Sequence, residues 1–528
     1  MSHSFSQVPR AEIPRARFDR SCGHKTTFDA GNLVPVFVDE ALPGDTFNCR
    51  MTAFARLATP LHPFMDNMVL DSFFFAVPIR IIWDNFQKFN GEQANPADST
   101  DFLVPTMTSP VGGYTEASLS DYFGIPTLIA GLTHMSLFHR AYNLIYNEWF
   151  RDQNLQDSVV VDLDDGPDDP ADYVVKRRGK RHDYFTSALP WPQKGPAVEL
   201  PLGTVAPVTG IGPRVGDSAV IPGEDYRDAG GNVWGSTGSD PTISTQDSDH
   251  LAVLMQTTGL PGPTNEPQVF ADLSTATAAT INQLRQAFQI QKLYERDARG
   301  GTRYTEIIRA HFGVTSPDAR LQRPEYLGGG SSPINVNPVA QTSAASGEPT
   351  PQGNLAAFAT STMHGHGFTK SFTEHCVIIG MVCARADLNY QQGLARMFSR
   401  STRWDFYWPA LSHIGEQAVL NKEIFADGSA NDDLVFGYQE RFAEYRYKPS
   451  QITGQFRSNF AQSLDTWHLA QDFSTLPALN DAFIVENPPV DRVIAVPSEP
   501  HFLFDSYFKL ACARPMPIYS VPGLIDHF

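Results

Sequence analysis

The clearest pattern in this chain is a two-residue alternation of apolar and polar positions. In HFLFDSYFKLACAR (501–514), Asp505, Tyr507 and Lys509 fall on one face, and the opposite face carries Phe502, Phe504, Phe508, Leu510 and Cys512. Successive side chains of a strand point to opposite faces, so this pattern predicts a strand with one buried face. Segment 45–57 shows the same alternation, with Phe47, Cys49 and Met51 on one side. We therefore predict strands near both ends of the chain.

Two further segments are almost continuously apolar, which predicts buried strands. They are VLDSFFFAVPIRII (69–82), which Pro78 closes, and HCVIIGMVCA (375–384). Cys376 and Cys383 are seven residues apart and therefore fall on opposite faces of the second strand, where they cannot share a metal. We interpret all five cysteines of the chain as buried or free thiols.

A three- and four-residue spacing of apolar side chains marks the predicted helices. The clearest one spans 133–153, with Thr133 or Ser136 available as its N-cap and with an apolar face of Leu137, Phe138, Ala141, Leu144, Ile145 and Trp149. A short helix is expected after Asp84, with Phe86 and Phe89 on one side and Gly91 at its end. Another covers about 274–298, with Ile281, Leu284, Phe288 and Leu293 facing inward, and a last one spans 303–312 and ends at Gly313.

Strands at both ends and helices in the middle, without a repeating strand–helix alternation, favour a β-sandwich with helical insertions. Two stretches, 197–270 and 327–353, show no period and are rich in Gly, Pro, Ser and Thr. Loops of this length are uncommon in compact domains unless they have a function. We expect both stretches to be long loops.

Composition adds limits to this prediction. The 528 residues include 36 Phe and are 41% hydrophobic, which supports a large core, while 39 Gly and 40 Pro predict many turns. A formal net charge of −18 argues against a free-standing nucleic-acid binder, although local basic patches remain possible. No apolar run reaches the length of a membrane span, and the N-terminus lacks the apolar region of a signal peptide.

The stretch RHDYFTSALPWPQKG (181–195) contains the side-chain types of a nucleophilic triad, namely His182, Asp183 and Ser187. Triad members come from distant positions in known enzymes, and no G-x-S-x-G turn surrounds this serine. The two prolines that flank Trp191 fix the backbone instead. We interpret the stretch as a packed turn.

The acidic run VDLDDGPDDPAD (161–172) fails the spacing of an EF-hand, because Gly166 falls at position five counted from Asp162. A looser cation site stays open, but a solvated loop that pairs with the basic run KRRGKR (176–181) is the simpler interpretation. The basic run by itself is a candidate nucleic-acid patch.

Two Gly-containing motifs also fall short of a known site. HGHGF (364–368) and His375 lack partners at zinc-ligand spacing, so we interpret the motif as a Gly-rich turn. LGGGSS (327–332) lacks the Lys-Ser/Thr of a phosphate-binding loop. No enzyme motif and no cofactor motif remains, and the sequence favours a protein that builds surfaces.

Five stretches, in order along the chain, resemble one family. They are FDRSCGHKTTFDAGNLVPVFVDEALPGDTF (18–47), MDNMVLDSFFFAVPIRIIWDNFQKFNGE (65–92), HDYFTSALPWPQKG (182–195), LYERDARGGTRYTEIIRAHFGV (293–314) and GYQERFAEYRYKPS (437–450). The chain is similar to the major capsid proteins of the Microviridae, gokushovirus branch. The resemblance implies one eight-stranded antiparallel jelly roll over 1–528 with large helical and loop insertions.

The resemblance also implies a structural role in a virion. The family forms a T=1 icosahedral shell around a circular single-stranded DNA genome, with a scaffolding protein as partner, and we expect assembly in the cytoplasm of the bacterial host. In this branch an insertion at the position of 197–270 forms protrusions at the three-fold axes. We expect the same here, with host attachment as its role and with mutual contacts through Val220, Ile221, Val233, Trp234, Leu251, Val253 and Leu254.

The net charge of −18 predicts that a small basic partner protein carries most of the charge that balances packaged DNA. Our candidates for direct contact with single-stranded DNA are Arg10, Arg15, Arg17, Arg20 and Lys25 in an extended arm over 1–30, together with Lys509 and Arg514. The alternative is that these cations pair with carboxylates of neighbouring subunits. Two rival functions stay open, a carbohydrate-active β-sandwich enzyme and a receptor-binding spike of a phage.

Overall fold

The computed structural model describes residues 14–198, 208–209, 270–271, 281–315, 322–343 and 352–519. The chain forms two compact units. One comprises Gln193–Arg299, and the other comprises the segments on both sides of it.

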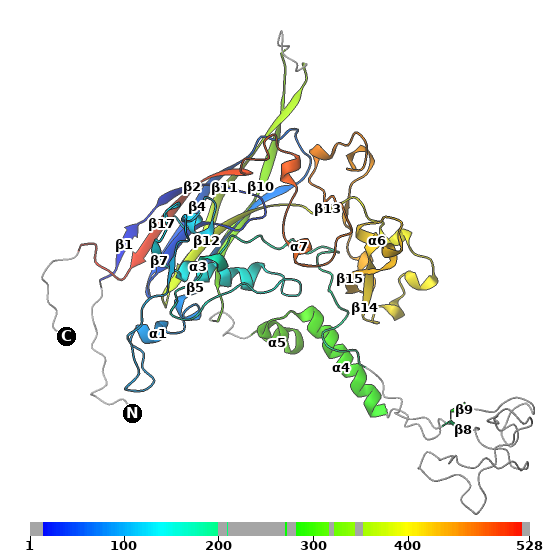
Figure 1. Cartoon of the computed structure of the whole chain (residues 1–528), viewed down its shortest axis with the longest axis horizontal. Coiled ribbons are helices and arrows are strands. Elements are labelled where there is room, and N and C mark those ends of the chain that lie inside the picture. Colours follow the sequence, from blue (N-terminus) through cyan, green and yellow to red (C-terminus); the bar gives the residue numbers. More distant parts are fainter. Residues whose placement is uncertain are drawn as a thin grey trace, which may run out of the picture. The chain divides into compact units, whose positions relative to one another are not determined.

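An antiparallel sheet forms the centre of the larger unit (Figure 1). Its order is β1 (Ala16–Asp19), β17 (Phe502–Arg514), β4 (Thr46–Leu57), β11 (Leu355–Ser371), β10 (Glu325–Ala340), β5 (Met68–Pro78), β12 (Cys376–Ala386) and β3 (Val34–Ala41). Strand β2 (Cys22–Phe28) follows β1 along the same edge of β17, so nine strands fill eight positions. The expected antiparallel jelly-roll sandwich with insertions is confirmed, and the four strands predicted from the sequence are β4, β5, β12 and β17.

The sheet curls until its two ends meet. Phe37 of β3 and Phe508 of β17 belong to opposite ends of the strand order, yet their ring centroids are 5.0 Å apart. Arg20, between β1 and β2, places its Nη1 atom 2.6 Å from the Asp39 carboxylate of β3. The inside of the curl is the main core, formed by the apolar faces of these strands.

A second core covers the outer face of β5 and β12. Helix α3 (Leu137–Ile145) and the π-helical turn Tyr146–Phe150 that continues it supply its outer layer. Cys376 belongs to the first core and Cys383 to the second, which confirms that they lie on opposite faces of β12. All five cysteines are free, and four of them are buried.

The helix expected over 133–153 is confirmed at its centre and begins later than predicted. Thr133–Met135 forms strand β7 and pairs with β6 (Thr106–Thr108), so α3 starts at Leu137. Ser136 holds the cap position, but its side chain makes no capping hydrogen bond. The predicted short helices are α1 (Phe86–Phe89) and α5 (Tyr304–Phe312), which ends at the left-handed Gly313, and an unpredicted one is α2 (Leu119–Tyr122).

Helix α4 (Ile281–Gly300) is present as predicted, but the inward face assigned to it is wrong. Ile281, Phe288 and Leu293 are 69%, 64% and 49% exposed, and Leu284 is half-buried. Besides this helix, the described part of the smaller unit has only the two-residue strands β8 (Val208–Thr209) and β9 (Phe270–Ala271), and these described elements do not bury its apolar stripe.

The loop expected over 327–353 is wrong for its first half, because Glu325–Ala340 forms strand β10. Its glycines are required by close packing rather than by a turn. A Cβ atom at Gly330 would lie 2.7 Å from the His366 ring, and one at Gly328 would lie 2.3 Å from the Gly367 carbonyl oxygen. The strand therefore lacks the side-chain alternation on which the prediction depended.

The Gly-rich turn expected at HGHGF is also wrong. Residues 364–368 lie inside β11, where the register with β4 shifts between His364 and His366. Gly365, with φ of 73°, supplies the left-handed residue of this bulge. Beside this bulge His366 is half-buried, while His364 stays exposed.

The second half of the expected arm over 1–30 is extended but paired. Residues 16–19 and 22–28 hydrogen-bond to β17, whose edge would otherwise be open. Residues 1–13 lie outside the described part of the chain.

The insertion after β12 and the stretch 181–195 share a third core, built around Tyr184, Phe185, Tyr390 and Phe436. Its regular elements are β13 (Asn389–Tyr390) with β16 (Ser450–Gln451), β14 (Glu416–Leu420) with β15 (Val435–Glu440), α6 (Asn421–Ile424) and α7 (Asp481–Ile484). Among the described residues, no helix combines the length and the apolar character needed to cross a membrane.

Candidate functional site

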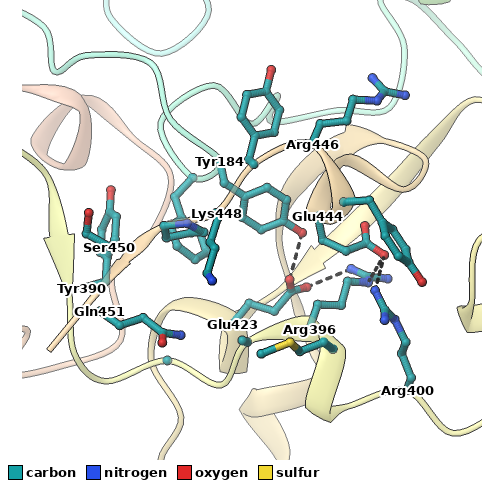
Figure 2. A pocket seen from close by; sticks show the side chains of 17 residues that line it. Tyr184, Tyr390, Arg396, Arg400, Glu423, Glu444, Arg446, Lys448, Ser450 and Gln451 are labelled. Atoms are coloured by element: carbon teal, nitrogen blue, oxygen red, sulfur yellow. Dashed lines mark hydrogen bonds and ion pairs between the residues drawn. The ribbon is translucent and has the colours of Figure 1, made fainter. Parts of the chain in front are cut away.

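A pocket of about 400 Å³ opens in the insertion that follows β12 (Figure 2). Its walls come from residues that are far apart in the sequence, from Tyr184 to Gln451. The charged and aromatic side chains around it are Tyr184, Phe185, Tyr390, Arg396, Arg400, Glu423, Glu444, Tyr445, Arg446, Tyr447 and Lys448. This set combines two carboxylates with several cations, so the state of the carboxylates decides what chemistry the pocket can perform.

The carboxylate of Glu423, on α6, is buried and accepts hydrogen bonds from three donors. Its Oε2 atom accepts a hydrogen bond from the Tyr184 hydroxyl at 2.9 Å, and Oε1 accepts from Arg396 Nη1 at 2.8 Å and from the Leu420 amide at 2.9 Å. Burial raises the pKa of Glu423 above its ordinary value, against the opposing effect of Arg396. Burial likewise raises the pKa of the Tyr184 hydroxyl.

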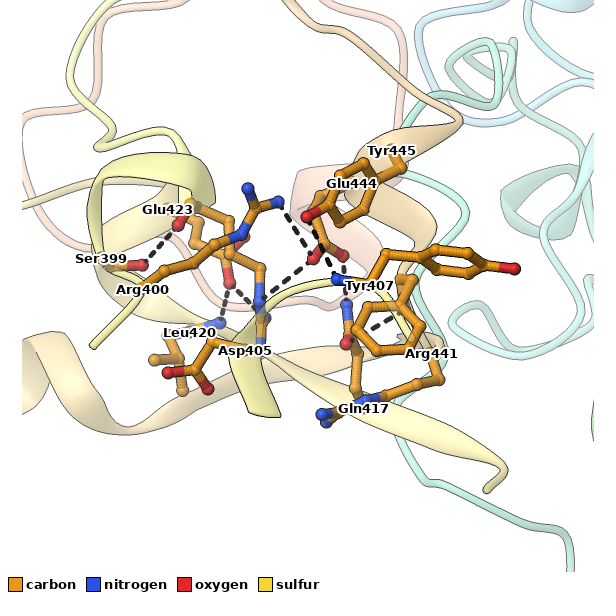
Figure 3. Close-up of polar contacts among 12 residues, drawn as sticks. Ser399, Arg400, Asp405, Tyr407, Gln417, Leu420, Glu423, Arg441, Glu444 and Tyr445 are labelled. Carbon is orange, nitrogen blue, oxygen red and sulfur yellow. Dashed lines mark hydrogen bonds and ion pairs between the residues drawn. The ribbon is translucent and has the colours of Figure 1, made fainter. Parts of the chain in front are cut away.

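Glu444 extends the same network (Figure 3). Its Oε2 atom accepts a hydrogen bond from Gln417 Nε2 at 2.6 Å, and its Oε1 atom lies 3.6 Å from Arg400 Nη2 and 4.0 Å from Arg396 Nε. General acid–base catalysis needs a carboxyl group that is free to exchange a proton with a substrate. Both carboxylates here are balanced by arginines, so the arrangement stabilises the pocket wall and does not form a catalytic pair.

The stretch 181–195 forms part of the same wall and is not a triad. Asp183 Oδ1 accepts hydrogen bonds from the amides of Phe185 and Thr186 at 2.9 and 2.8 Å, and Oδ2 accepts from the Tyr390 hydroxyl at 2.7 Å. The Ser187 hydroxyl donates to the Asp183 carbonyl oxygen and accepts from Gln439. His182 is exposed and makes no contact with the serine, which supports the interpretation as a packed turn.

The acidic run 161–172 surrounds a buried arginine. Arg140 Nε donates to Asp168 Oδ2 at 2.7 Å, and Arg140 Nη2 lies 3.4 Å from Asp164 Oδ1. Asp165 accepts a hydrogen bond from the Trp83 indole at 2.7 Å, and Asp162 accepts one from Tyr173 at 2.9 Å. These carboxylates are therefore engaged by side chains of the chain itself.

The expected pairing of this acidic run with the basic run 176–181 is wrong. Arg178 instead forms an ion pair of 2.6 Å with Asp71 of β5, which also binds Arg385 at 2.6 Å. Arg181 lies 3.5 Å from Asp387, and Lys180 is buried beside the Phe483 ring. The run therefore forms its ion pairs with carboxylates on β5 and just after β12, not with its neighbour in sequence.

The histidine motif holds packing contacts. His366 Nδ1 lies 2.8 Å from Ser72 Oγ, and Nε2 lies 3.4 Å from Ser332 Oγ. Burial lowers the pKa of His366 below its ordinary value. Within the described ranges, no group of three or more His, Cys, Asp or Glu side chains is placed to hold a metal ion.

The proposed DNA-contact cations divide into two groups. Arg20 pairs with Asp39, Arg514 Nε lies 3.1 Å from Asp45, and Arg15 donates to Thr46 Oγ1 at 2.6 Å. Arg20 thus links the two ends of the strand order, and Arg15 and Arg514 are bound at the start of β4. The second group, Arg17, Lys25 and Lys509, shares the exposed face of β1, β2 and β17.

Several predicted residues cannot be placed. Arg10 and the proposed protrusion contacts lie outside the described residues, namely Val220, Ile221, Val233, Trp234, Leu251, Val253 and Leu254.

Comparison with known proteins decides the family. The family model described as "Capsid protein (F protein)" matches residues 6–524. The chain belongs to this capsid protein family. It is 51% identical to capsid protein VP1 of Bdellovibrio phage phiMH2K, over 100% of this chain and 98% of that protein. It is 46% identical to capsid protein VP1 of Chlamydia phage 1, with 99% and 98% covered, and 38% identical to that of Spiroplasma virus 4, with 99% and 97% covered.

These relatives confirm the resemblance to gokushovirus capsid proteins of the Microviridae. This capsid protein is a structural component of a virion, and its family assembles into capsids. The same finding contradicts the alternative of a carbohydrate-active enzyme, since the homologues are structural proteins. The two carboxylates of the pocket agree with this, because both are bound by side chains of the protein itself.

The pocket network of this capsid protein was missed at the level of sequence. Tyr184 and Glu423 are separated by 239 positions, and the stretch 181–195 that contains Tyr184 was interpreted only as a packed turn. No spacing pattern in the sequence links the two residues, because their contact depends on which distant segments meet.

Proposed function

We propose that this capsid protein assembles into a T=1 icosahedral shell that encloses a circular single-stranded DNA genome. The observation that carries the proposal is the similarity to three VP1 capsid proteins over nearly the whole length of the chain. The curled antiparallel sandwich agrees with it, because this architecture is a common solution for viral shells.

Purified particles test the shell and the genome separately. Electron microscopy with symmetry averaging is expected to give uniform particles with one copy of the chain per icosahedral unit. Nucleic acid extracted from them should be degraded by a nuclease specific for single strands and resist exonuclease. Particles of helical symmetry, or a double-stranded genome, would contradict the proposal.

The insertion over 197–270 is the part that we assign to host attachment, as a protrusion at the three-fold axes. Exposed loops on a rigid scaffold are where recognition usually resides, and the sequence of this insertion has few apolar residues for a core of its own. Replacement of 203–268 by a Gly-Ser linker is expected to leave assembly intact and to reduce adsorption to host cells.

A matched control replaces 344–351, between β10 and β11, by a linker of the same kind. If the 203–268 variant adsorbs to host cells as well as this control does, the insertion has no role in attachment. Failure of the 203–268 variant alone to assemble would make that insertion part of the shell.

Further partners follow from charge. A chain with a net charge of −18 cannot neutralise packaged DNA by itself, so a small basic protein of the same virus supplies most of the counter-charge. The other proposed partners are a scaffolding protein and a host-surface receptor, and assembly takes place in the host cytoplasm. Mass spectrometry of purified particles is expected to detect the basic protein.

A further inference from the structure

One face of the main sheet is left open to solvent. On the side of β2, β17 and β4 that points away from the core, the exposed side chains include Lys25, Arg50, Phe54, Arg56, Tyr507 and Lys509. We call these six residues the open sheet face. In Figure 1 these strands lie on the part of the sheet away from α3, which covers β5 and β12.

The register of the strands places these side chains next to one another. Lys509 is directly opposite Arg50, Tyr507 is opposite Thr52, and Leu503 is opposite Arg56. Phe54 is opposite Asp505, which in turn is opposite Lys25. Because paired residues of neighbouring strands point to the same side, cations and rings form a continuous surface.

The charge of this surface differs in sign from that of the chain. The exposed cations here, with Arg17 included, number five, against the two carboxylates Asp19 and Asp505. Lys25 lies 3.3 Å from Asp505, but among the described residues no carboxylate lies within ion-pair distance of Arg50, Arg56 or Lys509. These unpaired cations make the open sheet face a local surface of positive charge on a chain whose net charge is −18, and such a surface attracts an anionic partner.

The rings on this surface are also available. Phe54 is 47% exposed and Tyr507 is 54% exposed, and they stand on adjacent strands in diagonal positions, about 7–8 Å apart. Exposed aromatic rings between unpaired cations are the combination by which proteins hold single-stranded nucleic acid, since bases stack on the rings and phosphates meet the cations.

We propose that the open sheet face binds single-stranded DNA and lies toward the interior of the shell. The inference rests on the proposed function, which supplies the genome, and it adds the location and the residues. Arg50, Arg56 and Lys509 contact phosphates, and Phe54 and Tyr507 stack on bases, without preference for a sequence because every base has an aromatic face.

Salt dependence tests the phosphate contacts. We would measure the binding of fluorescent oligo(dT) to the full-length protein by anisotropy at several salt concentrations. In the double variant Arg50→Gln/Arg56→Gln, the slope of log affinity against log salt is expected to fall by about 1.4, at about 0.7 per contact with a single strand. The control Lys88→Gln/Arg285→Gln removes the same charge from exposed cations outside this face and is expected to leave the slope unchanged.

A second pair of variants tests stacking. Phe54→Leu and Tyr507→Leu keep an apolar side chain but remove the ring. Each is expected to weaken oligo(dT) binding roughly five-fold or more, since stacking on one ring contributes at least about 1 kcal/mol. A surface that only packs against a neighbouring subunit would tolerate these substitutions in the DNA assay.

The outcomes separate this inference from the proposed function. If both variant sets bind oligo(dT) like their controls, the open sheet face is not the DNA site. If they lose assembly but keep DNA binding, the face is a contact between subunits. If wild-type particles hold no single-stranded DNA, the proposed function itself fails.

A measurement on unmodified particles covers the case in which variants are insoluble. Ultraviolet cross-linking should attach nucleotides to peptides from 46–57 and 502–514, and cross-links found only in other peptides would overturn the inference.

Discussion

The guanidinium of Arg140 is completely buried, and the carboxylate of Asp168 that accepts its hydrogen bond is buried with it. Removal of one member of such a pair leaves an uncompensated charge in the second core. We expect Arg140→Met to lower the free energy of unfolding by roughly 3–5 kcal/mol. Urea unfolding of the full-length protein measures the loss.

The control for Arg140 is Arg181→Gln, because Arg181 lies on the surface beside an exposed partner, Asp387. Such pairs contribute less than about 1 kcal/mol. Equal stability of the two variants would show that Asp168 finds another partner or a proton.

His139 gives the second core a dependence on pH. Its Nε2 atom lies 2.9 Å from Ser120 Oγ, and burial, with a contribution from His134, lowers its pKa from 6.5 to about 3. Between these two pH values, the unfolded chain therefore binds a proton at His139 and the folded chain does not. The contribution of this residue to stability is complete above pH 6.5 and is lost as the pH falls toward 3.

We expect His139→Gln to flatten the pH dependence of unfolding between about pH 4 and pH 6.5, where His139 contributes up to about 1.4 kcal/mol per pH unit. Urea unfolding at a series of pH values measures this slope. The exposed His413→Gln serves as the control and should retain the slope of the wild type. A wild-type slope in His139→Gln would assign the acid sensitivity to other groups.

Single residues were predictable where their role is local. The stretch 181–195 was predicted as a packed turn, and in the structure Asp183 accepts hydrogen bonds from amides two and three positions ahead. The partners of buried charges were not predictable, because they depend on which distant segments meet. Arg178 shows this, since it pairs with Asp71 and not with the acidic run beside it in sequence.

Among the elements, β10 depends on glycine for its place in the sheet. A Cβ atom at Gly330 would lie 2.7–2.8 Å from three atoms of the His366 ring, which is held by Ser72. We expect Gly330→Ala to destabilise the protein by roughly 1–3 kcal/mol through overpacking, measured as a lower Tm of the full-length protein.

Gly23→Ala in β2 is the matched control, because its added Cβ would meet only the Ser506 carbonyl oxygen at 3.6 Å. A Tm for Gly330→Ala as high as that of this control would mean that the His366 ring moves aside without cost.

Elements with a strong period were predictable, and elements without one were not. β4 and β17 alternate because one face packs on the core and the other meets solvent, so the sequence carries their geometry. The glycine-rich part of β10 shows no such alternation, because its glycines leave room for side chains of β11. The apolar face of α4 shows the converse, because a helical period predicts a stripe but not a partner that covers it.

At the scale of the whole molecule, the class of fold was predictable and the order of the strands was not. Strand order requires knowing that Phe37 and Phe508, which are far apart in sequence, meet across the curl. Resemblance to a family supplied the closed architecture that periodicity could not supply.

The surface of the molecule also carries information about assembly. The segment RWDFYW (403–408) exposes Trp404, Phe406, Tyr407 and Trp408, and the Arg403 guanidinium lies 4.5 Å from the centre of the Trp408 ring. Trp, Tyr and Arg are the residues that contribute most to binding at protein interfaces. Since the family assembles into capsids, we expect neighbouring subunits to cover this segment.

We therefore expect Trp404→Glu and Phe406→Glu to prevent assembly while the subunit stays folded. A carboxylate would have to be buried without a partner in the contact, whereas on the free subunit it remains in water. Sedimentation velocity would show slow subunits in place of particles, and circular dichroism would match the wild type. Trp404→Phe and Phe406→Leu keep an apolar side chain at each site and should still assemble. Particles formed normally by the glutamate variants would place the subunit contacts elsewhere on the surface.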